Sequence, residues 1–246
     1  MKLKCICCDA IARPVYHCAA VSPHQVDIEL VKLGLHVKPK ELKEQLQLKI
    51  SAATAQSYDA ILLGYGLCGQ ATRGLIAENI PLIIPKAHDC ITLYLGSRDR
   101  YLTEHSKCPG TIWYTKDYME RSRNDKGTIY LGMDIETAPP SLYERYIEKY
   151  GQKKADYLMQ IMGDWQKNYE RLVFIDQGMM DTATEEASAK ADAEKKGWRF
   201  EKLTGDLNLI RQLVFGDWND DFLIVKPGEQ IAMAFGKEVI TSEASF

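Results

Sequence analysis

The sequence has no long apolar segment and no strong excess of charge of either sign. No uninterrupted apolar run reaches the roughly 18 residues that a membrane-spanning helix needs. The net charge is −3 over 246 residues, which is too small to attract nucleic acid or an anionic membrane surface. We therefore expect no nucleic-acid or membrane partner, and a small-molecule substrate instead.

The sequence also lacks a secretion signal and an even number of cysteines. Residues 1–6 already follow the pattern of a strand, which is not how a signal peptide begins. There are seven cysteines, and in a chain without a secretion signal we expect thiols to stay reduced. The expectation is a cytoplasmic protein whose cysteines are core residues, nucleophiles or metal ligands.

What the sequence does contain is an alternation of strand and helix patterns. Hydrophobic residues make up 46% and charged residues 26%, as in ordinary globular proteins. Alternating strands and helices are typical of a largely parallel, Rossmann-like α/β sheet flanked by helices. We expect one α/β domain over residues 1–246, with two lobes, 1–125 and 126–246, as the alternative.

The expected elements follow from apolar runs, helical spacing and glycine or proline positions. An exposed loop is expected at 121–126. Strands are predicted at residues 2–8, 26–33, 59–63, 80–84, 111–114, 171–176, 198–203 and 222–225, and helices after residue 9, at 39–56, from Gly69 to Glu78, and at 140–168, 184–196 and 207–215.

Cysteine and histidine side chains follow three of the predicted strands. Cys8 ends the first strand, Cys68 follows the strand at 59–63, and His88 and Cys90 follow the strand at 80–84. Because the carboxyl ends of parallel strands share one edge, we expect these side chains to converge. Thiolate and imidazole are ligands of Zn²⁺, although the chain lacks the paired cysteine spacing of known zinc motifs.

Glycines in the same region permit a second interpretation. Gly64, Gly66 and Gly69 match G-x-G-x-x-G between a strand and a predicted helix, the context of dinucleotide binding. Asp89 lies about twenty residues further on, as that fingerprint requires, but several residues past its strand. Tyr65 would also narrow the approach of a phosphate. The alternative is a tight turn that simply requires glycine.

A third interpretation makes Cys68 a nucleophile. At the start of a helix the thiol of Cys68 would have a lowered pKa, because the helix dipole stabilises the thiolate. His88 would then be its base. This interpretation needs the same convergence as a metal site but leaves Cys8 and Cys90 unexplained.

Residues 58–69 and 87–97, read together, resemble an uncharacterised family, domain of unknown function 1638. Cys8-Asp9 looks like the family's Cys–acidic pair, and further similarity lies at 168–172, 205–207, 216–218 and 222–228. The resemblance implies that Cys8, Cys68, His88 and Cys90 form a reactive set holding Zn²⁺ or a [4Fe–4S] cluster. It also implies an association with corrinoid-dependent methyltransferase proteins.

These observations lead to a hypothesis of a metal-binding protein that supports thiol or methyl-transfer chemistry. Cys8, Cys68 and Cys90 would be thiolate ligands, and His88 the fourth ligand or an acid/base with Asp89. Asp9 and Asp89 would orient His88 or accept protons. Cys7 and Cys8 point to opposite faces of a strand, so only one can be a ligand, and the resemblance favours Cys8. The alternative functions are a non-catalytic accessory protein of a methyltransferase system and a dinucleotide-binding protein.

Overall fold

The computed structural model of the chain describes residues 1–124, 144, 147–148, 150–157, 168–234 and 238–245. The chain divides into two compact units. Unit 1 combines Met1–Thr103 with Thr204–Phe246, and unit 2 is Glu104–Leu203. The chain leaves unit 1 within helix α4 (Arg98–Lys107) and returns at the end of strand β7 (Arg199–Thr204).

Unit 1 is built on a five-stranded sheet in the order β2-β1-β3-β4-β8. Its first four strands are parallel, and β8 pairs antiparallel with β4 at one edge. The predicted α/β, mostly parallel sheet is therefore confirmed. The strands are β1 (Lys2–Cys8), β2 (Gln25–Val31), β3 (Ala60–Gly64), β4 (Leu82–Pro85) and β8 (Phe222–Val225).

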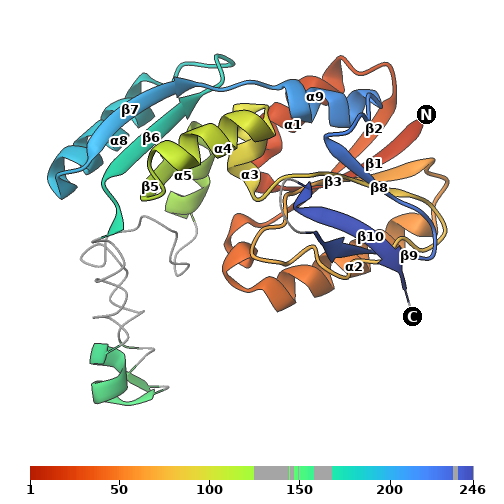
Figure 1. Cartoon of the computed structure of the whole chain (residues 1–246), viewed down its shortest axis with the longest axis horizontal. Coiled ribbons are helices and arrows are strands. Elements are labelled where there is room, and N and C mark those ends of the chain that lie inside the picture. The colour runs from red at the N-terminus through yellow and green to blue at the C-terminus, as the bar shows by residue number, and fades with distance from the viewer. Residues whose placement is uncertain (125–143, 145–146, 149, 158–167, 235–237, 246) are drawn as a thin grey trace. The chain divides into compact units, whose positions relative to one another are not determined.

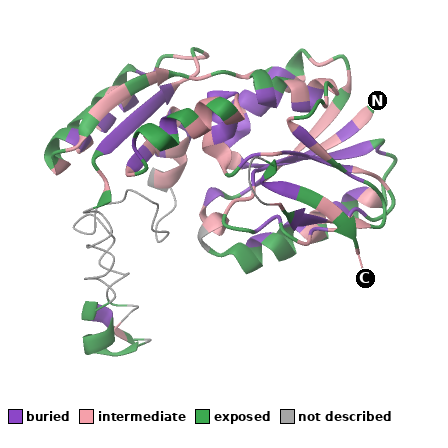
Figure 2. Cartoon of the chain, viewed as in Figure 1, coloured by how far each residue is buried: buried purple, intermediate pink, exposed green. Residues whose placement is uncertain are grey.

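Helices cover both faces of this sheet, which is why its strands β3 and β4 are apolar throughout. Figure 1 shows α1 (Ala12–Ala20) and α9 (Asn208–Phe215) on one side and α2 (Pro39–Thr54) on the other. All five residues of β3 are buried, as the purple strands of Figure 2 show. Helix α2 buries Leu42, Leu46, Ile50 and Ala53 at helical spacing, and Pro39 suits its first position because the missing N–H has no helical partner there. Two short 3₁₀ helices, η1 (Asp9–Ile11) and η2 (Leu33–Val37), precede α1 and α2.

The helix predicted from Gly69 to Glu78 is wrong. This segment forms a turn and then an extended piece that pairs with β9 (Glu229–Met233) through an Ile76–Gln230 bridge. Gly74 has a φ of +73°, which a helix does not contain. Strands β9 and β10 (Ile240–Ala244) form an antiparallel hairpin that the sequence patterns did not predict.

Unit 2 contains a three-stranded sheet in the order β5-β6-β7, with β5 (Thr111–Tyr114) parallel to β6 (Arg171–Asp176). Helix α8 (Ala183–Lys196) packs on β6 and ends at Gly197, whose φ of +69° is the usual helix stop. Helix α5 (Lys116–Asn124) extends into the segment expected as a loop at 121–126, so that expectation is corrected up to Asn124. Most of the helix expected at 140–168 lies outside the described residues.

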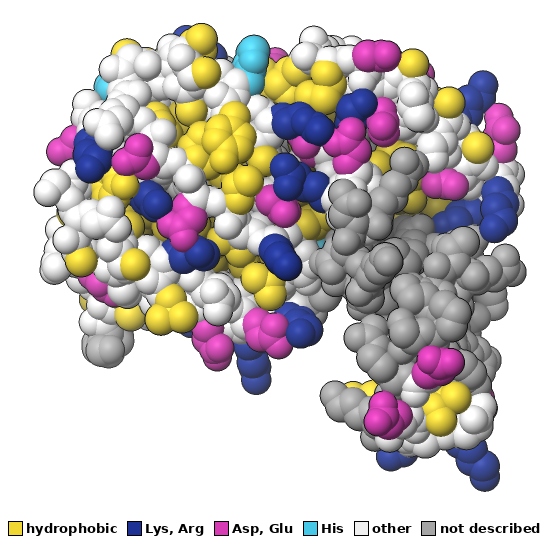
Figure 3. All heavy atoms as spheres, turned by 180° about the vertical axis from the view of Figure 1, so that it is seen from behind, with side chains coloured by type: hydrophobic (Ala, Val, Ile, Leu, Met, Phe, Trp, Pro, Cys, Tyr) yellow, Lys and Arg dark blue, Asp and Glu magenta, His cyan; other side chains and the backbone are white. Residues whose placement is uncertain are grey.

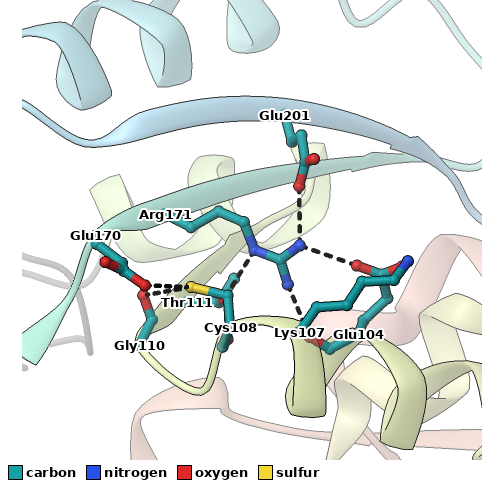
Figure 4. A network of polar contacts seen from close by, with 8 residues as sticks. All are labelled: Glu104, Lys107, Cys108, Gly110, Thr111, Glu170, Arg171 and Glu201. Carbon is teal, nitrogen blue, oxygen red and sulfur yellow. Dashed lines mark hydrogen bonds and ion pairs between the residues drawn. The ribbon is translucent and has the colours of Figure 1, made fainter.

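A charged side chain lies at the centre of unit 2. Arg171 is 1% exposed, and its guanidinium donates to Thr111 Oγ1, Glu104 Oε2, Glu201 Oε2 and the Glu104 carbonyl at 2.8 to 3.0 Å (Figure 4). Although burial alone would raise it, hydrogen bonds from Lys107 and Arg171 hold the pKa of Glu104 below its usual value. The buried charge is therefore paired and hydrogen-bonded, as burial requires.

The surface seen in Figure 3 mixes Lys and Arg with Asp and Glu, and among the coloured residues no large area carries one sign. This agrees with the small net charge. In the part of the chain that the structure describes, no helix is long and apolar enough to cross a membrane.

Candidate thiol site

Three loops of unit 1 meet at the carboxyl edge of the parallel sheet. In the β1–β3 register Cys7 lies opposite Gly64, so Cys8 leaves β1 beside the start of the glycine-rich loop. That loop is tied to the loop after β4, because Leu67 N–H donates to the Ala87 carbonyl at 2.8 Å and Cys68 N–H to the His88 carbonyl at 2.9 Å.

The loop after β4 also connects to the short segment that follows β1. It leads into α3 (Cys90–Leu95), whose Tyr94 hydroxyl donates to the Ala10 carbonyl. The loops that carry Cys8, Cys68 and Cys90 are therefore linked in a closed set by backbone pairing and by Tyr94.

The glycines of the loop allow this close approach. A Cβ on Gly66 would lie 2.7 Å from both the Ala87 carbonyl oxygen and the Asp89 nitrogen, which is too close for any side chain. A Cβ on Gly64 would lie 2.3 Å from the Cβ of Cys7. The glycines thus bring loop backbones together at the thiols.

Asp89 organises the start of α3. Its carboxylate accepts from Ile91 N–H at 3.0 Å as a helix cap and from the Tyr101 hydroxyl at 3.3 Å. Burial raises the pKa of Asp89, and these hydrogen bonds only partly offset the effect. Because Cys90 is the first residue of α3, this cap fixes the backbone that carries its thiol.

The three thiols act on one another electrostatically. Burial, then the nearby Asp89 and Cys8, raises the pKa of Cys68 to about 12. Burial, then Asp89, Cys68 and Cys8, raises the pKa of Cys90 well above its usual value. Both residues keep some exposed surface although their thiols are desolvated. The structure therefore brings the loops of Cys8, Cys68 and Cys90 together, and the thiols of Cys68 and Cys90 are protonated near neutral pH.

Cys7 belongs to the core side of β1. It is fully buried, and its pKa is raised well above the usual value, first by a hydrogen bond with Cys5 and then by burial. Cys8, by contrast, is one of the groups that raise the pKa values of Cys68 and Cys90.

The interpretation of Cys68 as an activated nucleophile is wrong on two counts. No helix begins at Cys68, which lies in a turn with a φ of +46°, and its thiol pKa is raised, whereas activation requires it to be lowered. The missing helix also removes the strand–turn–helix context of the dinucleotide fingerprint at Gly64, Gly66 and Gly69. Asp89, its proposed ribose ligand, instead caps α3.

Two buried hydroxyl groups near the thiols have no hydrogen-bond partner among the described residues. They belong to Tyr65, 3% exposed, and Thr92, 1% exposed. Burial, then the nearby Cys8 and Cys68, raises the pKa of Tyr65 well above its usual value, so its hydroxyl lies close to the thiols. A buried hydroxyl without a partner is unfavourable unless a ligand completes it.

His88 faces a cavity on this side of unit 1. Its ring stacks on Tyr101 with centroids 5.8 Å apart, and the residue is exposed. The cavity has a volume of about 180 Å³, and Thr92, Lys86 and Arg98 also line it. Arg98 pairs with Asp221 at 2.8 Å. His88 thus lines a small cavity, and none of the three cysteines is among the described residues that line it.

A bound metal ion needs several donor side chains in position at the same time. In the described ranges no three His, Cys, Asp or Glu side chains stand in positions that could hold a metal together. Protonated thiols have no reason to adopt such positions, and each cysteine moves its sulfur by one χ1 rotation between staggered rotamers. The residue types are those that bind a thiophilic metal, and the loops that carry them are linked at one edge of the sheet.

Fold and site together define an α/β protein with a parallel-sheet unit that carries three converging thiols. The family comparison makes the assignment specific: a family model described as "Protein of unknown function (DUF1638)" matches residues 30–214, and the chain belongs to this family. The match includes Cys68, His88 and Cys90, whereas Cys8 lies before it. No curated protein and no solved structure matches the chain.

Sequence reasoning missed Tyr65, Thr92 and Tyr101 as parts of this site. Tyr65 was considered only as an obstacle to phosphate, and its position between two loop glycines was the available signal. Tyr101 lies on α4, and no local pattern in the sequence links it to Asp89.

Proposed function

We propose that unit 1 binds a thiophilic metal through Cys8, Cys68 and Cys90, and that the metal supports thiol or methyl-transfer chemistry. The observation that carries the proposal is that the three loops are linked to one another. Cys68 N–H donates to the His88 carbonyl, Cys7 pairs with Gly64 in the sheet register, and the Tyr94 hydroxyl donates to the Ala10 carbonyl. The loops that carry the three thiols are linked by these contacts, which favours a shared role over a chance cluster of core cysteines.

Zn²⁺ is the first choice of metal. Three thiolates and one further ligand give the tetrahedral set that zinc prefers, and His88 is a candidate for the fourth position. A [4Fe–4S] cluster held by three cysteines is the alternative. When bound, the metal would keep coordinating thiols deprotonated, which supplies a sulfur nucleophile at neutral pH.

The residues around the cavity suggest how a substrate would be handled. His88 lies on the Tyr101 ring and lines the cavity, so it can take or give a proton there without leaving its place. Asp89 holds Tyr101 by a hydrogen bond. A substrate with a thiol group, bound in the cavity, would present that group to His88.

The association with corrinoid-dependent methyltransferase proteins remains part of this proposal. A thiol acceptor and a methyl donor protein would together make a methyl-transfer system, in which this chain either catalyses the transfer or serves as an accessory. Turnover of a methyl donor with a thiol separates these two roles.

The proposal is tested by anaerobic purification, elemental analysis and an absorption spectrum. We expect about one metal site per chain, colourless for zinc and brown for a cluster. Cys68→Ala and Cys90→Ala should lose most of the metal, because an under-coordinated ion binds weakly. Cys18→Ala and Cys108→Ala, which truncate buried cysteines elsewhere, are matched controls and should retain it. Full metal content in both Cys68→Ala and Cys90→Ala, or no metal in the wild-type chain, would refute the proposal.

A further inference from the structure

A second and larger cavity of unit 1 lies on a different set of elements. Its volume is about 490 Å³, within the range of small-molecule sites. The first turns of α2, the turn at residues 69–74 and the β9–β10 hairpin line it.

Three cationic side chains line this cavity, Lys40 and Lys43 from α2 and Arg73 from the turn. Within the described residues none of them forms an ion pair. Other cations of unit 1 do so: Lys4 and Lys49 with Glu29, and Arg98 with Asp221. Cations left together without a carboxylate repel one another, so an anion between them would be stabilising.

Among the described residues that line the cavity there is one carboxylate, and it does not neutralise the three cations. Glu243 accepts a hydrogen bond from Gln230 Nε2 at 3.0 Å, so it is already engaged by the hairpin. Three cations against one carboxylate leave a positive excess at this surface.

The turn at residues 69–74 has several left-handed residues, and it lies against the ammonium group of Lys43. Gly69, Gln70 and Gly74 all have positive φ values, 65°, 72° and 73°. A Cβ on Gly74 would lie 2.6 Å from the ammonium nitrogen of Lys43, which shows that this flexible side chain lies against the turn. A Cβ on Gly69 would contact only Pro39 Cγ, at 3.9 Å, so the cavity side of the turn is open there.

The start of helix α2 also favours an anion in this cavity. Lys40 lies in the first turn of α2, where the dipole already carries partial positive charge and a cation is unfavourable. An anion at this position would relieve both the helix end and Lys40. Arg73 supplies a planar fork that fits phosphate oxygens, and the lysines supply point charges.

From these observations we infer that this cavity binds a small molecule bearing phosphate groups, held by Lys43, Arg73 and Lys40. The site is distinct from the thiol site and does not depend on the metal proposal. It also differs from a dinucleotide fingerprint, because the charge comes from side chains and not from the start of a helix after Gly69.

Isothermal titration of the full chain with inorganic pyrophosphate and with ADP, at fixed ionic strength, tests the inference. We expect saturable binding of at least one probe. Arg73→Ala and Lys43→Ala should each weaken it about tenfold or more, because each removes a charge-assisted contact. Lys190→Ala, an exposed cation of unit 2, is the control and should bind as the wild type does. Heat from chelation of a bound metal would be equal in all variants, because their thiols are intact.

Citrate separates phosphate recognition from general attraction of anions. Pyrophosphate or ADP should bind more tightly than citrate at the same ionic strength. Equal binding of citrate, undiminished binding in Arg73→Ala and Lys43→Ala, or no saturable binding of either phosphate probe would each overturn the inference.

Discussion

Arg171 in unit 2 and Tyr65 in unit 1 are both buried, at 1% and 3% exposure, but they differ in how their polar atoms are satisfied. The Arg171 guanidinium makes four hydrogen bonds and lies over the Trp113 ring. The Tyr65 hydroxyl has no partner among the described residues, and the Cys68 thiol near it is protonated near neutral pH.

The difference separates a structural cluster from a functional candidate. A buried polar network that satisfies all its members stabilises a fold and has nothing left to offer a ligand. A buried cluster with unsatisfied groups is unfavourable in the isolated chain, and a bound ligand can complete it. The Arg171 network is therefore a structural part of unit 2, and the thiol site is the candidate for chemistry.

The largest effect on the free energy of unfolding is expected from Arg171→Met. The substitution leaves Glu104 buried without its guanidinium partner, so we expect a loss of about 3–5 kcal/mol in the free energy of unfolding. Urea unfolding followed by circular dichroism measures it. Glu201→Gln is the control, because Glu201 is half-exposed and its ion pair is screened, and it should lose about 1 kcal/mol or less. Equal losses in the two variants would contradict the closed-network interpretation.

The next effect concerns the glycine-rich loop of the thiol site. Gly66→Ala places a Cβ against the Ala87 carbonyl and the Asp89 nitrogen, so the loops must separate, at a cost of about 1–3 kcal/mol. We expect the metal content to fall with the stability.

Gly69→Ala is matched to this change, because it lies three residues along the same loop. Its new Cβ meets only Pro39 Cγ at 3.9 Å, and its cost is the left-handed backbone, about 1–2 kcal/mol. It should keep the metal. Loss of metal in Gly69→Ala but not in Gly66→Ala would show that close approach of the loops is not what the site needs.

The central sheet could be predicted from local patterns, because buried parallel strands such as Ile61-Leu62-Leu63 are apolar runs between turn residues. The meeting of the loops that carry Cys8, Cys68 and Cys90 followed from the same sheet, since parallel strands share one carboxyl edge. These inferences needed only the chain direction and the burial pattern.

Pairings between distant segments could not be predicted in this way. Ala71 and Leu75 are four residues apart, a spacing that suits a helix, yet the segment pairs with β9, about 150 residues further along the chain, and Gly74 takes a left-handed conformation. Strand β8 likewise returns to pair with β4 and completes unit 1 from the other end of the chain. Such contacts depend on tertiary structure, and the local pattern of apolar residues does not predict them.

A smaller effect, of opposite sign, is expected from Tyr65→Phe. Removing a buried hydroxyl without a partner should leave the metal-free chain as stable as before or more stable by about 1 kcal/mol. Thermal unfolding of the metal-free protein measures it. Tyr94→Phe is the control, because the Tyr94 hydroxyl donates to the Ala10 carbonyl, and it should lose about 1 kcal/mol. Clear destabilisation by Tyr65→Phe would mean that its hydroxyl is satisfied in the folded chain.

The smallest effect is the acid sensitivity of the Arg171 network. Because the folded-state pKa of Glu104 lies below its usual value of about 4.5, its contribution to stability is complete above that pH. The contribution is lost as the pH falls through the folded-state pKa, while Arg171 keeps its contacts with Thr111 and Glu201. The difference in unfolding free energy between wild type and Glu104→Gln should therefore shrink from pH 7 to pH 3. In the metal-free chain, Cys68→Ala should show no such change, because a thiol with a pKa of about 12 is protonated at both pH values. A Glu104→Gln difference that stays constant from pH 7 to pH 3 would show that Glu104 carries no stabilising charge in the folded protein.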